Sequence, residues 1–398
     1  MIRHLFRLVW NRKKRNLLLM FEIFCSFLVL FYLMSILVSF TTRYLTPLGF
    51  EYENVWVLSL GYEHAGEGVS DEQQKNTLQQ VVLELKSHPE ITNYSLAMGC
   101  LPYGRSVWMN TLKLDGKDYQ STIILADTNF AQTMGLTISN GRWFSSADRL
   151  AGVAPLIVSG DLYEEITGDT IAIGRRFVKD DSVEVELIGV VDNYRFRGDF
   201  ENTPGFWFRF KQNFDSAGVS LPDNIILRVG SGATGRFEQQ LLDNLKRIAP
   251  EWSPRIETLS DRRSSYIRDN MFRLLGMGSV AGFLVLNVAL GLFGVLWYSI
   301  NRRRSEIALR RALGADRQGI AGQIIGEALA LASLAMLIGL FFAVQVPLLG
   351  FDSTIGFGEY LMAMLLSILA IYTLVLVCSY YPGWLGMRIH PAQALRDE

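Results

Sequence analysis

Four long apolar runs restrict what this chain can fold into more than any other feature. The first is Leu17–Phe40, and the others cover roughly 274–300, 320–348 and 360–381. A helix rises about 1.5 Å per residue, so about 20 apolar residues cross a hydrocarbon core of about 30 Å. Charged residues make up only 19% of the chain, against about 25% in soluble domains. The runs therefore predict four transmembrane helices.

Two other interpretations of these runs are weaker. A secretory signal peptide has a shorter apolar stretch of about 7–15 residues and a small-residue cleavage site. The first run shows neither feature. Buried helices of a soluble core would account for one such run, but not for three that follow one another closely with almost no charge. We therefore expect all four runs to be retained membrane segments.

Basic residues next to the runs predict the orientation of the helices. Lys and Arg resist translocation, so short loops rich in them stay in the cytoplasm. Segments 1–16, 301–319 and 382–398 together hold 14 basic residues against four acidic ones, a net charge of +10. We therefore expect both termini and the 301–319 loop in the cytoplasm, with 41–272 and the short 349–359 turn on the other side.

The segment 41–272 has the pattern of a mixed α and β domain. Alternating or β-branched runs bounded by turn residues predict strands at 54–60, 106–114, 122–125, 153–158 and 183–190. Helical spacing of apolar residues predicts helices at Asp71–Ser87 and Gly235–Ile248. The expected fold class is an α-helical integral membrane protein, with a large two-lobed α+β extracytoplasmic domain inserted between its first and second transmembrane helices.

This segment offers little catalytic chemistry. The four histidines and three cysteines form no zinc-binding pattern, and no GxxxxGK[ST] phosphate loop occurs. Asp180, Asp181, Glu184 and Glu186 would allow a calcium or acid–base cluster. Alternation along a strand instead places Glu184 and Glu186 on one solvated face, which is the interpretation we favour. No metal, cofactor or enzyme activity is expected of this chain by itself.

Two aromatic groups in the same segment allow two interpretations. They are Trp143–Phe144 and Phe206–Phe208. Exposed aromatic patches mark partner surfaces, whereas aromatic residues of α+β domains more often belong to the core. We favour the core.

The stretch 302–320 is the most informative part of the cytoplasmic loops. An apolar stripe of a short helix is formed by Ile307, Ala308, Ala312 and Leu313. Arginines fringe the stripe, and Gly314 is a suitable C-cap. Such a helix rests on anionic lipid head groups, or it presses into the groove of a cytoplasmic protein, with Ile307, Leu309 and Leu313 as anchors.

At this point the sequence resembles the FtsX-like permeases, and among them the macrolide-exporter (MacB-type) branch. The loop is similar to the family pattern through Glu306, Ile307, Arg311, Ala312, Leu313, Gly314 and Ala315, followed by Glu327. The tail is similar through His390, Pro391, Ala392, Gln393, Ala394, Leu395 and Arg396. In the large domain the similar stretches are Phe130–Phe144, Ile173–Gly174 and Ile188–Val191.

The resemblance implies a dimer, of identical or different chains, in a bacterial inner membrane, with 41–272 periplasmic and a stalk near 259–275. It implies that an ABC ATPase drives the machine and that this chain relays the motion outward. The macrolide exporter carries its ATPase fused to the permease, but this sequence contains no GxxxxGK[ST] phosphate loop, so we expect a separate subunit to hydrolyse ATP. The implied coupling helix comprises Arg303, Arg304, Glu306, Ile307, Ala308, Leu309, Arg310, Arg311, Ala312, Leu313, Gly314 and Ala315. A periplasmic adaptor or outer-membrane factor and membrane lipid are further partners that it allows, and nucleic acid is not among them.

Two rival functions stay open beside this one. A regulatory scaffold that controls a periplasmic enzyme would need no export. A ligand-sensing membrane protein would need no ATPase, although a passive anchor gains nothing from an apolar stripe in the loop. Glu327, with Glu22, is one of the two acids within the predicted spans, where a charge is expensive and suggests a role. Both lie near the cytoplasmic ends, where snorkelling or an arginine partner explains them equally well.

Overall fold

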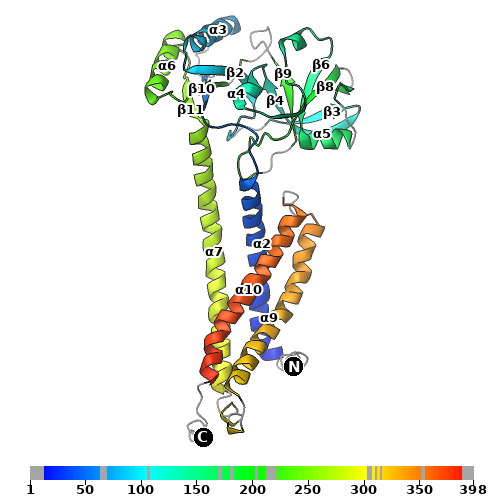
Figure 1. Cartoon of the computed structure of the whole chain (residues 1–398), viewed down its shortest axis with the longest axis vertical. Coiled ribbons are helices and arrows are strands. Elements are labelled where there is room, and N and C mark those ends of the chain that lie inside the picture. The colour runs from blue at the N-terminus through cyan, green and yellow to red at the C-terminus, as the bar shows by residue number, and fades with distance from the viewer. Residues whose placement is uncertain are drawn as a thin grey trace. The chain divides into compact units, whose positions relative to one another are not determined.

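The computed structural model describes residues 13–62, 70–104, 108–168, 173–179, 183–201, 205–211, 221–222, 224–302, 307–309, 312–313, 316–350 and 355–387. The chain divides into two compact units. The membrane unit combines Met1–Thr42 with Met271–Glu398, and the inserted domain is Arg43–Asn270. Figure 1 shows the helices and strands of both.

Among the described residues, four helices are long and apolar enough to cross a membrane. They are α2 (Lys13–Leu45), α7 (Leu259–Arg302), α9 (Arg317–Leu348) and α10 (Phe357–Met387). An α+β domain lies between the first and the second of them in the chain, so the predicted combination of four membrane helices with an inserted α+β domain is confirmed. The protein is a multi-pass membrane protein.

Small side chains allow the helices of the membrane unit to pack closely. Ala328, Ala332 and Ala335 on α9 are buried in one apolar cluster with residues of α2 and α10. Gly339 of α9 faces the ring of Phe27 of α2 so closely that an added Cβ would lie 2.5 Å from it. Lipid tails are as apolar as leucine, so such close van der Waals packing is what holds membrane helices together.

Within its described residues, the inserted domain contains eleven strands in one connected sheet system. The strands are β1 (Val55–Ser59), β2 (Ile91–Gly99), β3 (Met109–Leu114), β4 (Lys117–Ala126), β5 (Ile138–Gly141), β6 (Ala154–Ser159), β7 (Arg176–Lys179), β8 (Val183–Val191), β9 (Phe206–Phe210), β10 (Asn224–Val229) and β11 (Arg255–Thr258). The helices described in this domain, apart from the ends of α2 and α7, are α3 (Asp71–Ser87), α4 (Phe130–Met134), α5 (Gly160–Thr167) and α6 (Gly235–Ile248), with a 3₁₀ turn η2 at Ser146–Arg149.

One lobe of the inserted domain is a sheet in the order β11–β1–β10–β2–β4, with α3 and α6 beside it (Figure 1). Strand β1 is buried on both faces. Trp56 and Leu58 point into a cluster with the apolar sides of α3 and α6, and Val55 and Val57 point into the cluster that holds α4. The two-residue period of a strand thus divides its side chains between two cores.

The other lobe is a ring of six strands. Following the pairings gives β4–β3–β7–β8–β6–β9, and β9 returns to β4 in parallel from Thr122–Phe206 to Ala126–Phe210. Strands β3 and β7 share the single pair Leu114–Lys179. Closing a sheet on itself removes exposed edges that would invite pairing with other chains.

Most predicted elements of this domain are confirmed. The helices predicted at Asp71–Ser87 and Gly235–Ile248 are α3 and α6, and β1, β3, β4, β6 and β8 lie at the predicted strands. The favoured core interpretation of the aromatic groups is also confirmed, because Phe144, Phe206, Trp207 and Phe208 are buried. Glu184 and Glu186 lie on one side of β8, where both reach the exposed Arg176. Asp180 and Asp181 lie outside the described residues.

Candidate functional site

The predicted cytoplasmic helix is described at Ile307–Leu309 and at Ala312–Leu313. Ile307 and Ala308 are buried against Ile300 of α7 and Ile320 of α9. Leu309 and Leu313 point away from that cluster, with 52% and 81% of their surface exposed. Part of the predicted stripe therefore packs inward, while two leucines one helical turn apart face outward.

A backbone hydrogen bond supports this turn. The amide of Leu313 donates to the carbonyl of Leu309 at 3.0 Å, which is the spacing of one α-helical turn. Ala312, predicted on the stripe, is exposed. The other residues of the predicted coupling helix, Arg303, Arg304, Glu306, Arg310, Arg311, Gly314 and Ala315, lie outside the described residues. The same holds for the 388–398 tail.

The two acids within the predicted membrane spans lie on different helices. Glu327 is half-buried on α9, and its Oε1 accepts a hydrogen bond from Nε2 of Gln323 at 3.2 Å. Glu22 of α2 lies against α7 at Gly291, where an added Cβ would meet its carboxylate at 2.5 Å. The bare backbone of Gly291 thus makes room for the Glu22 side chain.

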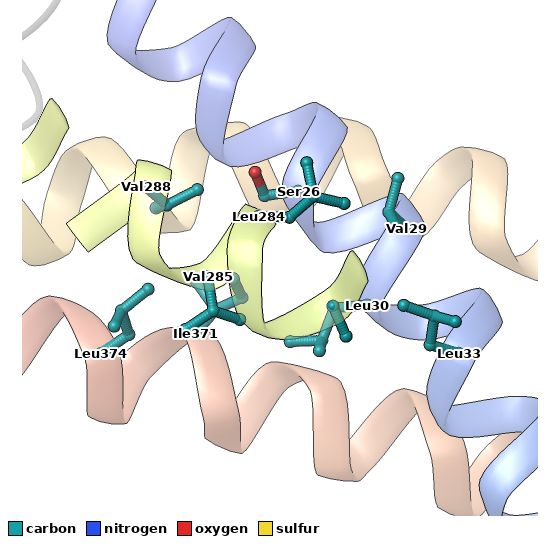
Figure 2. A pocket seen from close by; sticks show the side chains of 10 residues that line it. Ser26, Val29, Leu30, Leu33, Leu284, Val285, Val288, Ile371 and Leu374 are labelled. Carbon is teal, nitrogen blue, oxygen red and sulfur yellow. The ribbon is translucent and has the colours of Figure 1, made fainter. Parts of the chain in front are cut away.

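A pocket in the membrane unit lies among α2, α7 and α10 (Figure 2). Ser26 is its one polar lining residue, and Leu30, Val285 and Ile371 are among the apolar ones. The lining thus presents hydrocarbon and a single hydroxyl.

A polar cluster that the sequence analysis missed lies in the inserted domain, on the loop 193–201 between β8 and β9. Asp199 is 1% exposed, and its carboxylate accepts hydrogen bonds from Nε and Nη2 of Arg263 on α7, the shorter at 2.6 Å. The hydroxyl of Tyr103 donates to the same carboxylate at 3.1 Å. Two donors from one guanidinium fix both the distance and the plane of the pair.

Burial and the contacts with Asp199 change the pKa values of its neighbours. Its hydrogen bonds raise the pKa of the Arg263 guanidinium, against the opposite effect of burial. Burial, with a smaller contribution from the Asp199 charge, raises the pKa of Tyr103. Burial raises the pKa of Tyr266 to about 12. All three groups therefore keep their protons at neutral pH, with Arg263 charged and both tyrosines neutral.

No group of three or more His, Cys, Asp or Glu side chains that could hold a metal ion occurs among the described residues.

The fold therefore defines a multi-pass membrane protein with a large α+β domain between its first two membrane helices. Residues 278–391 match the family model of the FtsX-like permease C-terminal domain. The chain thus carries an FtsX-like permease domain, and its relatives are permeases of ABC transporters.

Three relatives illustrate this. The chain is 24% identical over 295 residues to the uncharacterized ABC transporter permease YknZ of Bacillus subtilis (strain 168), covering 71% of each chain. It is 20% identical over 296 residues to the pyoverdine export ATP-binding/permease protein PvdT of Pseudomonas fluorescens, and 22% identical over 313 residues to the macrolide export ATP-binding/permease protein MacB of Wolinella succinogenes. In both of these alignments 72% of this chain is matched, but only 44% and 45% of the longer relatives.

Two solved structures are similar to the inserted domain. The periplasmic region of MacB from Actinobacillus actinomycetemcomitans matches 56% of this chain and 97% of its own, with 13% identity and a TM-score of 0.39. The extracellular domain of YknZ from Gram-positive bacteria matches 51% of this chain and 100% of its own, with 14% identity and a TM-score of 0.36.

Proposed function

We propose that this chain is the permease subunit of an ABC-type export machine and relays the work of a separate ATPase to its inserted domain. The observation that carries the proposal is the pair of exposed leucines, Leu309 and Leu313, in the loop between α7 and α9. Large apolar side chains facing outward from a short helical turn are what a groove-binding helix presents to its partner.

The orientation in this proposal follows from charge. The basic segments around 1–16 and 301–319 stay in the cytoplasm, so both termini and the leucine pair face the ATPase. The inserted domain then lies on the periplasmic side of a bacterial inner membrane. Relatives that are described as exporters, PvdT and MacB, favour export over a purely regulatory scaffold.

The motion is relayed by the helices and needs no catalytic group in this chain. Two ATPase subunits closing on ATP would push the loops of two permease chains, identical or different, and α7 carries the displacement. At about 1.5 Å per residue, its 44 residues extend about 66 Å, well beyond a hydrocarbon core of about 30 Å. Membrane lipid surrounds the helices, and a periplasmic adaptor or outer-membrane factor would receive the exported substrate.

A pull-down from native membranes tests this proposal. We expect an ATPase subunit to copurify with the wild-type chain and to be lost from the Leu309→Asp/Leu313→Asp variant. The matched control is Leu83→Asp/Leu150→Asp, which makes the same change at two leucines of the inserted domain that are somewhat more exposed, at 64% and 89%. Loss of the ATPase from both variants, or from neither, would contradict the assignment of the leucine pair.

A further inference from the structure

The loop 193–201 contacts the ends of two membrane helices at once. The last residues of α2, from Arg43 to Leu45, and the first turns of α7, from Leu259, both belong to the inserted domain. Arg195 and Phe200 of the loop reach the α2 end, while Asp199 and Phe200 reach α7. Two segments more than 200 positions apart in the chain are thus joined through one short loop.

Arg195 caps the C-terminal end of α2. Its Nη1 donates to the carbonyl oxygens of Arg43 at 2.6 Å and Thr46 at 3.1 Å, and its Nη2 donates to the carbonyl of Asp199 at 3.1 Å. In return, Nη1 of Arg43 donates to the carbonyl of Phe200 at 3.1 Å. The last carbonyls of a helix have no partner within it and carry partial negative charge, so a buried guanidinium satisfies both needs.

Asp199 holds the N-terminal end of α7 through the two hydrogen bonds from Arg263 described above. The same guanidinium also lies over the ring of Tyr52, with its Cζ 4.4 Å from the ring centroid. Arg263 is therefore held from two directions, by a carboxylate and by an aromatic face. Pulling α7 away would leave the Asp199 charge buried without its partner, which is strongly unfavourable.

Phe200 joins the two ends directly. Its ring stacks on Tyr44 of α2 at 5.8 Å between centroids and on Tyr266 of α7 at 6.0 Å, with interplanar angles of 16° and 22°. Tyr266 in turn contacts Tyr103 at 5.5 Å, which leads into the core of the domain. A ring that stacks on two others resists displacement of either neighbour.

We propose that the loop 193–201 is a clamp that locks the end of α2, the start of α7 and the inserted domain into one rigid body. With the clamp closed, α7 cannot slide past α2 at this end. The role of the clamp in relaying motion rests on the proposed function. Displacement of α7 by the ATPase must then move the whole inserted domain. Asp199, Arg195 and Arg263 are positioning residues in this account.

Spin-label distances in the full-length, detergent-solubilised chain test the clamp. Labels are placed at Leu45→Cys and Ser264→Cys, both exposed, in a background where Cys25, Cys100 and Cys378 are replaced. We expect one narrow distance distribution for the wild-type loop and at least a twofold broader one for Asp199→Asn. The matched control is Glu257→Gln, which breaks the Arg262–Glu257 pair of the same 2.6 Å length and should leave the distribution narrow.

A distribution that is already broad with the wild-type loop, or equally narrow in Asp199→Asn, would overturn the clamp. If Asp199→Asn does not fold, Arg263→Lys is measured instead, since it keeps the charge and loses the paired guanidinium donors. Asp199→Asn should still copurify with the ATPase, because it leaves Leu309 and Leu313 untouched. Failure of the clamp is therefore distinguishable from failure of the proposed function, which is tested by copurification alone.

Discussion

Arg263 and Asp199 meet with Nη2 and Oδ1 2.6 Å apart, and the carboxylate is almost fully buried. Removing one partner of such a pair leaves a buried charge uncompensated, which typically costs 3–5 kcal/mol. Since 21% of the Arg263 side chain is exposed, we expect Asp199→Ala to lower the free energy of unfolding of the inserted domain by about 3 kcal/mol, the low end of that range. Thermal unfolding of the full chain, followed by tryptophan fluorescence, measures this.

The control for that measurement is Glu257→Ala. It removes a salt bridge of equal length in which the carboxylate is 56% exposed, so the expected loss is below about 1 kcal/mol. Equal losses for the two variants would show that burial of Asp199 contributes nothing to the strength of its pair.

Gly198 is predicted to be intolerant of any side chain. Its φ is +100°, and an added Cβ would lie 2.8 Å from the Tyr266 ring and 3.0 Å from the Tyr103 ring. Gly198→Ala therefore carries both the cost of a positive φ, about 1–2 kcal/mol, and a clash with two packed rings.

Gly116→Ala is the control, because Gly116 also has a positive φ, +76°, but nothing within 4 Å of an added Cβ. We expect Gly198→Ala to lower the melting temperature more than Gly116→Ala. Equal shifts would mean that the rings move aside freely, which would weaken the case for a rigid clamp.

The Arg142–Asp148 pair predicts how the inserted domain responds to acid. The Asp148 carboxylate accepts hydrogen bonds from Arg142 and from the amide and hydroxyl of Ser145. These bonds, led by that of Arg142, lower the pKa of Asp148 from 3.8 to about 2. A depressed folded-state pKa means that the stabilisation is fully present above about pH 4 and is lost as the pH falls toward 2.

Melting temperatures of the full chain between pH 2 and pH 6 test this assignment. Asp148→Asn should lower the value at pH 6 and should show a smaller further decrease on acidification than the wild type. An acid-induced decrease of the same size in both proteins would assign the acid sensitivity to other carboxylates.

Two glycines of α9 should respond differently to substitution by alanine. At Gly339 an added Cβ would lie 2.5 Å from Cδ1 of Phe27, so Gly339→Ala should force α2 and α9 apart and destabilise the membrane unit. At Gly322 nothing lies within 4 Å, and alanine should be neutral or slightly stabilising because it favours the helix. Unfolding in mixed detergent micelles compares the two; destabilisation by Gly322→Ala of similar size would contradict this packing.

The membrane helices could be predicted from composition because lipid requires an apolar surface over the whole span. Helix α3 could be predicted to the residue, since its apolar face is regular and Ser70 and Gln73 cap its start reciprocally. Strand β9 was missed because both of its faces are buried. Phe206 and Phe208 enter one core and Trp207 another, so the strand shows no polar alternation.

The clamp could not be predicted from the sequence, and the reason differs from that for β9. Asp199, Arg195 and Phe200 are unremarkable in a polar loop, and their partners come from 43–46, from Tyr103 and from the start of α7. Long-range contacts of this kind leave no periodic signal in the sequence. In the 301–319 loop the apolar residues can be recognised, but spacing alone does not separate Ile307 and Ala308, which pack inward, from Leu309 and Leu313, which face outward.

Site-specific photo-crosslinking from Leu313 in native membranes tests the central claim most directly. A photoreactive amino acid at Leu313, 81% exposed, should crosslink to a separate nucleotide-binding subunit, while the same group at Leu150, 89% exposed in the inserted domain, should not. Crosslinks from Leu313 only to lipid or to another copy of this chain would contradict the account.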